Sequence, residues 1–139
     1  MTAPTTTQVQ PGDKLPELAL DITPTVIIAA ALASRDFERV HHDRTHAQAS
    51  GMRDIFLNIL ATNGFVVRYV TDWAGPQAVV KQASIRLGVP HFAGETLTLS
   101  GSVEEIAPDG DVRIAVRGRN AVGDHVTGTV TVQLDGMSA

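Results

Sequence analysis

An acidic side chain and an imidazole lie close together in the first third of the chain, at Asp36 and His41 within the segment DFERVH. A carboxylate and a histidine ring can hold a water molecule and move its protons, which is general acid–base chemistry. On a regular helix this spacing would turn the two side chains roughly 140° apart, so they could not act on one substrate. The pair therefore requires a helix end or a folded loop between its members.

The residues that follow predict the elements that position this pair. Residues 42–51 (HDRTHAQASG) are polar and end in small residues, which is typical of a loop. Residues 54–70 (DIFLNILATNGFVVRYV) are apolar on nearly every side, which predicts a long helix buried all round. We expect this helix to begin near Gly51 and to end near residues 73–76 (WAGP), where glycine and proline stop it. Amides at its start can face a developing anion.

The rest of the chain predicts one strand and one helix before the pair, and four strands after the long helix. Residues 15–22 alternate as a strand does, and Thr23 and Pro24 are typical of a helix start. That helix covers residues 25–34 and stops near 35–37, which delivers Asp36 to a helix end. The later strands are expected at residues 78–89, 96–106, 112–118 and 125–134, as a meander with turns at 108–111 and 123–124.

This order of elements favours an α+β fold of the hot-dog type, in which a curved antiparallel sheet wraps around one central helix. The same order also suits an NTF2-like cone, so the pattern alone leaves two folds open. With 139 residues the chain predicts one domain, over residues 14–135, after a loose tail at 1–13 that is rich in Thr, Pro and Gln.

Composition excludes several classes of function. A net charge of −4 and a pI near 5.6, without a dominant basic run, argue against a nucleic-acid surface. Cysteine is absent, so neither a disulfide framework nor a thiolate metal site is possible, which fits a reducing compartment. The apolar run 26–33 (VIIAAALA) follows acidic residues and is too short to span a bilayer. We expect a cytoplasmic protein with no membrane contact.

The motif carries a resemblance to a known family. The spacing Asp36, four residues, His41, five residues, Ala47 resembles the hydratase motif of the MaoC-like enoyl-CoA hydratases, which have the hot-dog fold. Within that family, the chain is similar to the small subunits of actinobacterial heteromeric hydratases that act on steroid side-chain enoyl-CoA thioesters. The likeness covers roughly residues 15–134 and rests on the segments DFERVHHD, DIFLNIL, RYVTDWAGP, RLGVP and GRNAVGDHVT.

The chain departs from the family motif at one place. The usual Gly-Asp-x-Asn-Pro is here Arg-Asp-Phe-Glu-Arg, at residues 35–39. The loop geometry of the common family therefore cannot be assumed for this chain.

The resemblance implies an enoyl-CoA hydratase, a hydro-lyase of steroid or cholesterol catabolism. Asp36 and His41 would activate the water and return a proton, and Gly51, matched to a glycine that opens the central helix, would donate its amide to the thioester oxyanion. The substrate implied is a bulky trans-2-enoyl-CoA, a steroid with a shortened side chain, hydrated with R-type stereochemistry. Coenzyme A belongs to the substrate, so we expect neither a cofactor nor a metal. His42 remains open as an alternative base.

The resemblance also implies partners. A second, longer MaoC-like chain without the catalytic pair would form a heterodimer with this one, and two heterodimers would form a heterotetramer. An extra domain of that partner would dock a retro-aldol lyase. Pairing agrees with the physics, because a lone hot-dog sheet exposes an edge and half a pocket.

Other residues and functions compete with these assignments. His46 is expected on an exposed loop, and His91 and His125 in structural strand or turn positions. A zinc site at residues 41–46 lacks any recognised ligand spacing. Helical spacing makes Phe65, Tyr69 and Trp73 packing residues, or the lining of a sterol-sized pocket. For the function, an acyl-CoA thioesterase on the same fold and a non-catalytic lipid- or steroid-binding subunit remain alternatives.

Overall fold

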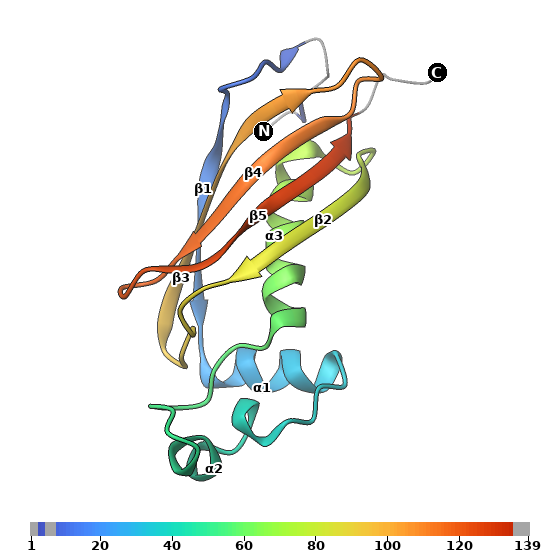
Figure 1. Ribbon diagram of the computed structural model, residues 1–139. Coiled ribbons are helices and arrows are strands. Elements are labelled where there is room, and N and C mark those ends of the chain that lie inside the picture. Colours follow the sequence, from blue (N-terminus) through green and yellow to red (C-terminus); the bar gives the residue numbers. More distant parts are fainter. Residues whose placement is uncertain (1–2, 5–7, 135–139) are drawn as a thin grey trace.

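Five strands form one antiparallel sheet that curves around the helix α3 (Figure 1). The computed structural model describes residues 3–4 and 8–134. Its elements in chain order are β1 (Lys14–Ile22), α1 (Pro24–Ala33), the 3₁₀ turn η2 (Arg39–His41), α2 (Arg44–Ala49), α3 (Ile59–Ala74), β2 (Val79–Leu87), β3 (Glu95–Ile106), β4 (Val112–Arg119) and β5 (Asp124–Gln133). This is the predicted hot-dog architecture, and the NTF2-like alternative is excluded.

The strands do not form the expected four-stranded meander. The sheet order is β1-β3-β4-β5-β2, so only β3, β4 and β5 are consecutive neighbours. β2 pairs with β5, as at Ser84 and Thr129, and β1 pairs with β3. Alternating hydrophobicity identifies a strand but does not identify its partner, which is why the expectation was wrong here. The order leaves β1 and β2 as the two edges of the sheet.

The inner face of the sheet and one face of α3 make the core. Along β4, Val112, Ile114 and Val116 are buried and alternate with the exposed Arg113 and Arg117. This alternation is expected of a sheet with one face packed and the other solvated. The packed face buries the hydrophobic side chains that contact α3, which fixes where the helix lies.

The central helix is not buried all round, as the sequence had suggested. Val66, Tyr69 and Val70 are buried on the face toward the sheet, whereas Arg68 and Asp72 are exposed on the opposite face. In the first turn of the helix, Ile59 and Leu60 are also 50% and 53% exposed. A single curved sheet covers only one face of the helix, so its opposite face and the apolar side chains of its first turn stay partly exposed in this chain. The helix ends at Ala74 before Gly75, as predicted.

Two segments expected to be loose are ordered. In the expected tail, Val9 is buried, the Gly12 amide donates to Val103 O at 2.8 Å, and the Val103 amide donates to Asp13 O at 2.8 Å. Residues 8–13 therefore belong to the packed domain, while residues 1–2, 5–7 and 135 lie outside the described part of the chain. In the expected polar loop, residues 44–49 form α2, capped by the side chain of Asp43.

A pair of histidines is buried in the core. The rings of His91 and His125 lie 5.4 Å apart, and burial lowers the pKa of each below its ordinary value. Nδ1 of His125 lies 2.7 Å from Val89 O, which can only accept, so Nδ1 carries the proton. In the neutral ring, Nε2 is an acceptor, and it lies 2.9 Å from the hydroxyl oxygen of Thr62, which also lies 3.2 Å from Asn58 O. Both histidines are thus held neutral within the fold.

This pair predicts a loss of stability in mild acid. Because the folded pKa of each ring lies below the ordinary 6.5, the unfolded chain takes up protons first as the pH falls. The free energy of unfolding should therefore be highest above pH 6.5 and fall below it, by at most about 1.4 kcal/mol per pH unit for each ring. Urea denaturation at pH 7.5, 6.5 and 5.5 measures this slope. His91→Asn should make the free energy of unfolding depend less on pH, whereas His42→Gln, at an exposed position, should leave this dependence unchanged. Equal slopes in the unaltered chain and both variants would contradict the assignment of the pH dependence to the buried histidines.

Candidate active site

The end of α1 delivers Asp36. The Arg35 amide donates to Leu32 O at 3.1 Å and the Asp36 amide to Ala31 O at 2.9 Å. Arg35 has a φ of +56°, so these two bonds close a Schellman motif with a left-handed residue just past the helix. Glycine is usual at that position. The helix stops where the sequence predicted, and Arg35 stands at the position where the family motif has glycine.

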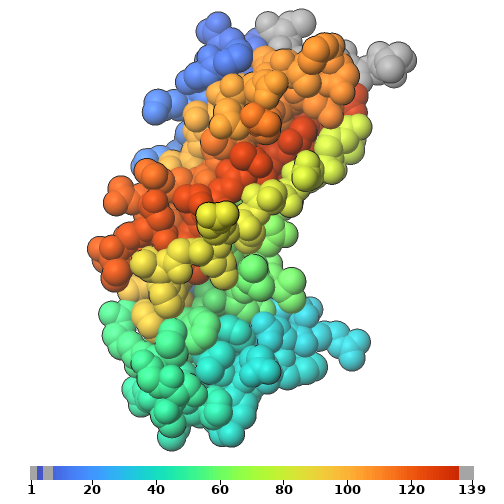
Figure 2. All heavy atoms as spheres, in the orientation of Figure 1, coloured from blue at the N-terminus to red at the C-terminus, as the bar shows by residue number. Residues whose placement is uncertain are grey.

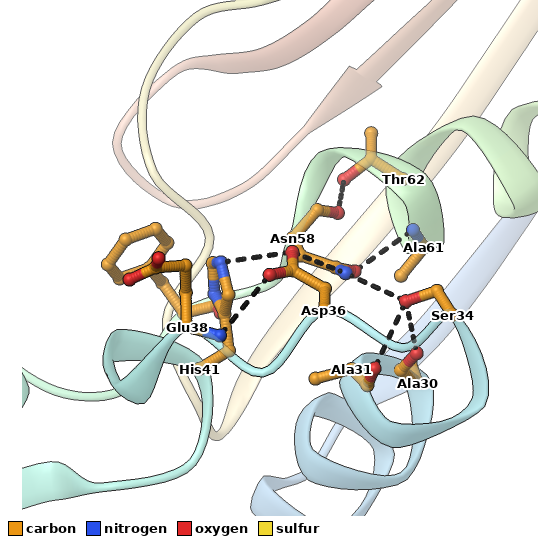
Figure 3. Close-up of polar contacts among 10 residues, drawn as sticks. Ala30, Ala31, Ser34, Asp36, Glu38, His41, Asn58, Ala61 and Thr62 are labelled. Atoms are coloured by element: carbon orange, nitrogen blue, oxygen red, sulfur yellow. Dashed lines mark hydrogen bonds and ion pairs between the residues drawn. The ribbon is translucent and has the colours of Figure 1, made fainter.

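His41 reaches Asp36 because the chain turns back between them. After Asp36 the chain enters the η2 turn, whose last residue is His41. Nε2 of His41 lies 3.5 Å from Oδ2 of Asp36, and both side chains are largely buried, with exposed fractions of 10% and 22% (Figure 3). The His41 ring also packs edge-on against Phe56, with centroids 4.9 Å apart. The predicted acid–imidazole pair is therefore present.

Hydrogen bonds fix the roles of the ring nitrogens. Nδ1 of His41 lies 2.7 Å from the carbonyl oxygen of Phe56, which can only accept, so Nδ1 donates a proton. When the ring is neutral, Nε2 is therefore the acceptor and presents its lone pair toward the Asp36 carboxylate. Two acceptors at this separation cannot bond each other, but a water molecule can donate one O–H to each. The geometry suits the holding of a nucleophilic water.

Asn58 completes the site and was missed by the sequence argument. It is 2% exposed, and its Nδ2 lies 3.0 Å from Oδ2 of Asp36 and 3.0 Å from Oγ of Ser34. Its Oδ1 accepts from the Ala61 amide at 3.0 Å, so Asn58 is the N-cap of α3. The hydrogen bond that Asn58 Nδ2 donates to Asp36 holds the pKa of the Asp36 carboxyl below its usual value, and the nearby His41 acts in the same direction. An asparagine directly before an apolar run is an N-cap signal that the sequence did contain.

Gly51 does not open the central helix, which corrects the sequence-based prediction. α3 begins at Ile59, and Gly51 follows the short helix α2 with a φ of +88°. Its amide already donates to Gln48 O at 3.0 Å. The glycine ends one helix instead of beginning another. The first turn of α3 lies near Asp36, and its amides at Ile59 and Leu60 have no acceptor within that helix.

The remaining candidate residues lie elsewhere. His42 is exposed, and His46 lies within α2. Tyr69 and Trp73 line a hollow of about 180 Å³ beside β1, in the C-terminal half of α3. That volume is below the range of about 300–1,000 Å³ typical of ligand pockets, so within this chain these residues do not form a sterol-sized site. Across the described residues, no cluster of three metal-ligating side chains and no helix able to span a membrane is found.

Comparison with known proteins identifies the class. The family model of the MaoC-like domain matches residues 6–132, most of the chain, and the chain belongs to this family. The fold is shared with the (R)-hydratase from A. caviae, at 22% sequence identity and a TM-score of 0.80, over 91% of this chain and 97% of that one.

Two matches within the family are much more similar. The chain is 54% identical over 123 residues to the 3-oxo-4,17-pregnadiene-20-carboxyl-CoA hydratase beta subunit of Mycobacterium tuberculosis, covering 88% of this chain and 95% of the relative. It also matches a chain in the crystal structure of the ChsH1–ChsH2 complex from Mycobacterium tuberculosis. That match has 51% identity and a TM-score of 0.87, over 90% of this chain and 98% of the other.

The left-handed Arg35 predicts a stabilising substitution. A non-glycine residue in this conformation costs about 1–2 kcal/mol, part of which glycine returns as extra entropy of the unfolded chain. Arg35→Gly should therefore raise the free energy of unfolding by roughly 0.5–1 kcal/mol. Ala33→Gly, two residues earlier inside α1, should lower it by about the same amount. Urea denaturation of both variants measures the difference; a destabilised Arg35→Gly would contradict the strain argument.

Proposed function

We propose that this chain is the catalytic subunit of an enoyl-CoA hydratase that adds water to a bulky trans-2-enoyl-CoA, a thioester on a steroid with a shortened side chain. The observation that carries the proposal is the pair of acceptors at Asp36 and His41, 3.5 Å apart, with the histidine tautomer fixed from behind by Phe56 O. Membership of the MaoC-like family and the name of the 54% identical relative support hydratase chemistry and a steroid acyl group.

The chemistry follows from the two acceptors. A water held by Asp36 Oδ2 and His41 Nε2 attacks the β-carbon, and one of the two groups takes its proton. The electron pair of the carbon–carbon double bond moves toward the thioester oxygen, which becomes an enolate. The group that took the proton then delivers it to the α-carbon, and the carbonyl re-forms. Water is consumed, no other reactant is needed, and the enzyme returns to its starting protonation.

The enolate oxygen needs stabilisation that this site can give without a charged side chain. The first-turn amides of α3, at Ile59 and Leu60, have no acceptor within the helix and lie next to the residue that binds Asp36. The positive end of the helix dipole adds to their effect. We assign the oxyanion role to this turn in place of Gly51.

The surroundings of the site support a partner chain. Phe37 is 60% exposed, and Ile59 and Leu60 are about half exposed, although all three flank the catalytic pair in sequence or in the structure. β2 forms an uncovered edge of the sheet (Figure 2), and Val79, which begins this strand beyond the C-terminal end of α3 and away from the site, is 52% exposed. We propose a heterodimer with a second MaoC-like chain that covers this side, pairing into a heterotetramer, with a retro-aldol lyase reached through the partner. A cytoplasmic location is part of the same proposal.

Removal of either acceptor should abolish hydration. Asp36→Asn and His41→Gln each replace a group that can take up a proton by an amide that cannot, so kcat should fall about 100-fold to 10,000-fold. The measurement is loss of enoyl absorbance with steroid and short straight-chain enoyl-CoAs, on the chain co-purified with its candidate partner. His42→Gln is the matched control and should keep full activity.

The same assay separates the alternatives. Release of free thiol from an acyl-CoA would indicate a thioesterase, and loss of enoyl absorbance without thiol indicates hydration. Assembled complexes that stay fully active with Asp36→Asn or His41→Gln would assign this chain a non-catalytic binding role.

Gly51 provides a test of the revised oxyanion site. Gly51→Asn keeps a residue that tolerates positive φ and retains the backbone amide bond to Gln48. Because this amide does not lie at the start of α3, kcat should stay within about twofold of the unaltered chain. A drop of 100-fold or more, the loss typical of an oxyanion donor, would return that role to Gly51.

A further inference from the structure

The Asn58 side chain uses all of its hydrogen-bonding groups to join three parts of the fold. Nδ2 donates one hydrogen bond to Asp36 Oδ2 and one to Ser34 Oγ, both with a length of 3.0 Å, and Oδ1 accepts from the Ala61 amide (Figure 3). Ser34 is the C-cap residue of α1, and its hydroxyl donates to Ala30 O at 2.8 Å. The end of α1, the start of α3 and the Asp36 carboxylate are therefore linked through one buried amide.

We propose that Asn58 is a positioning residue for the hydration reaction. Its side chain holds the Asp36 carboxylate in a fixed orientation toward His41 and at a fixed distance from the first turn of α3. The inference rests on the proposed function and extends it to a residue outside the acid–imidazole pair. It concerns orientation, since Asn58 itself donates no proton to the substrate.

The contacts of the carboxylate show why this link matters. Oδ2 of Asp36 is the oxygen that faces Nε2 of His41, and the same oxygen accepts from Asn58. Among the described residues, the other oxygen, Oδ1, has only a long contact of 3.4 Å, which is accepted from the Glu38 amide. Without Asn58 the carboxylate keeps its backbone position but loses the bond that orients Oδ2. The Asn58 bond is also the largest influence that keeps the pKa of this carboxyl low, so that Asp36 remains an acceptor.

The hydrogen bond from Asn58 to Asp36 also sets the distance between the Asp36–His41 pair and the first-turn amides of α3, which neither α1 nor α3 sets alone. The water-holding pair belongs to the segment after α1, and the oxyanion amides belong to α3. A substrate must meet both at once, because the β-carbon is attacked while charge develops on the thioester oxygen. Asn58 is the residue that contacts Asp36 with its side chain and begins α3 with its backbone.

Asn58→Ser tests the inference with little change to the helix. Serine caps a helix about as well as asparagine, but its hydroxyl is too short to bind Ala61 and Asp36 together. In the full chain assembled with its partner, kcat for enoyl-CoA hydration should fall about 10-fold to 100-fold, with KM nearly unchanged. A ¹³C-NMR titration should show the pKa of the Asp36 carboxyl raised. Asn58→Asp, similar in shape, should raise it further, because two carboxylates in contact cannot both ionise easily.

Thr23→Ala supplies the control for capping alone. Thr23 caps α1 through its Oγ1 and does not contact Asp36. This variant should lose stability, as a cap mutant does, with an unchanged Asp36 pKa and kcat.

Two results would overturn the inference. If Asn58→Ser keeps full kcat and an unaltered Asp36 pKa, the hydrogen bond from Asn58 to Asp36 is dispensable. If its activity falls only in proportion to the fraction of unfolded protein, with no change in the Asp36 pKa, the role of Asn58 is purely structural. In both cases the proposed function would stand as long as Asp36→Asn is inactive. If Asp36→Asn is active, the proposed function fails independently of any result at Asn58.

Discussion

The site depends on a meeting of two helix ends. α1 stops in a Schellman motif and presents Asp36, and α3 starts at a cap whose side chain binds that carboxylate. Helix ends carry unpaired backbone groups, which usually bind water or a side chain. Here Asn58 satisfies one helix and reaches the other, so the requirement for capping and the requirement for a fixed carboxylate are met by the same residue. In Figure 1, α1 and α2 gather at this end of α3, where β1 ends.

The sequence contained the parts of the site more clearly than their arrangement. Alternation and cap residues located β1, α1 and the end of α3 closely, because these signals are local. The same signals could not show that β2 pairs with β5, since pairing is decided by packing across the sheet. Gly51 shows how far a local signal can be interpreted. It has the positive φ that favours glycine, but this conformation follows the end of α2 and does not begin α3. The true start of α3 was marked by Asn58, which carries no motif of its own.

The one-sided burial of α3 explains why the fold and the function lead to the same expectation about partners. The apolar sequence of the helix suggests burial on all sides, yet this chain supplies a sheet for only one of them. Half-exposed apolar side chains near Asp36 and His41 raise the free energy of the isolated chain in water, and a covering surface removes that penalty. The same cover would exclude water other than the nucleophile and strengthen the hydrogen bonds to a developing anion. The assembly would then contribute to catalysis as well as to stability.

The departure from the family motif shows what determines the geometry. Arginine replaces the usual glycine at position 35 and still takes a φ of +56°, a conformation that costs such a residue about 1–2 kcal/mol. Strain of this size persists only where contacts with the surrounding structure stabilise the backbone conformation by more than the conformation costs. The Schellman bonds on one side and the Asn58 link on the other provide that constraint. Likewise the η2 turn begins at Arg39, where the motif has proline, and it still brings His41 back to Asp36. The spacing between Asp36 and His41 is therefore maintained by contacts between the two helix ends, and the residues of the motif can change as long as those contacts remain.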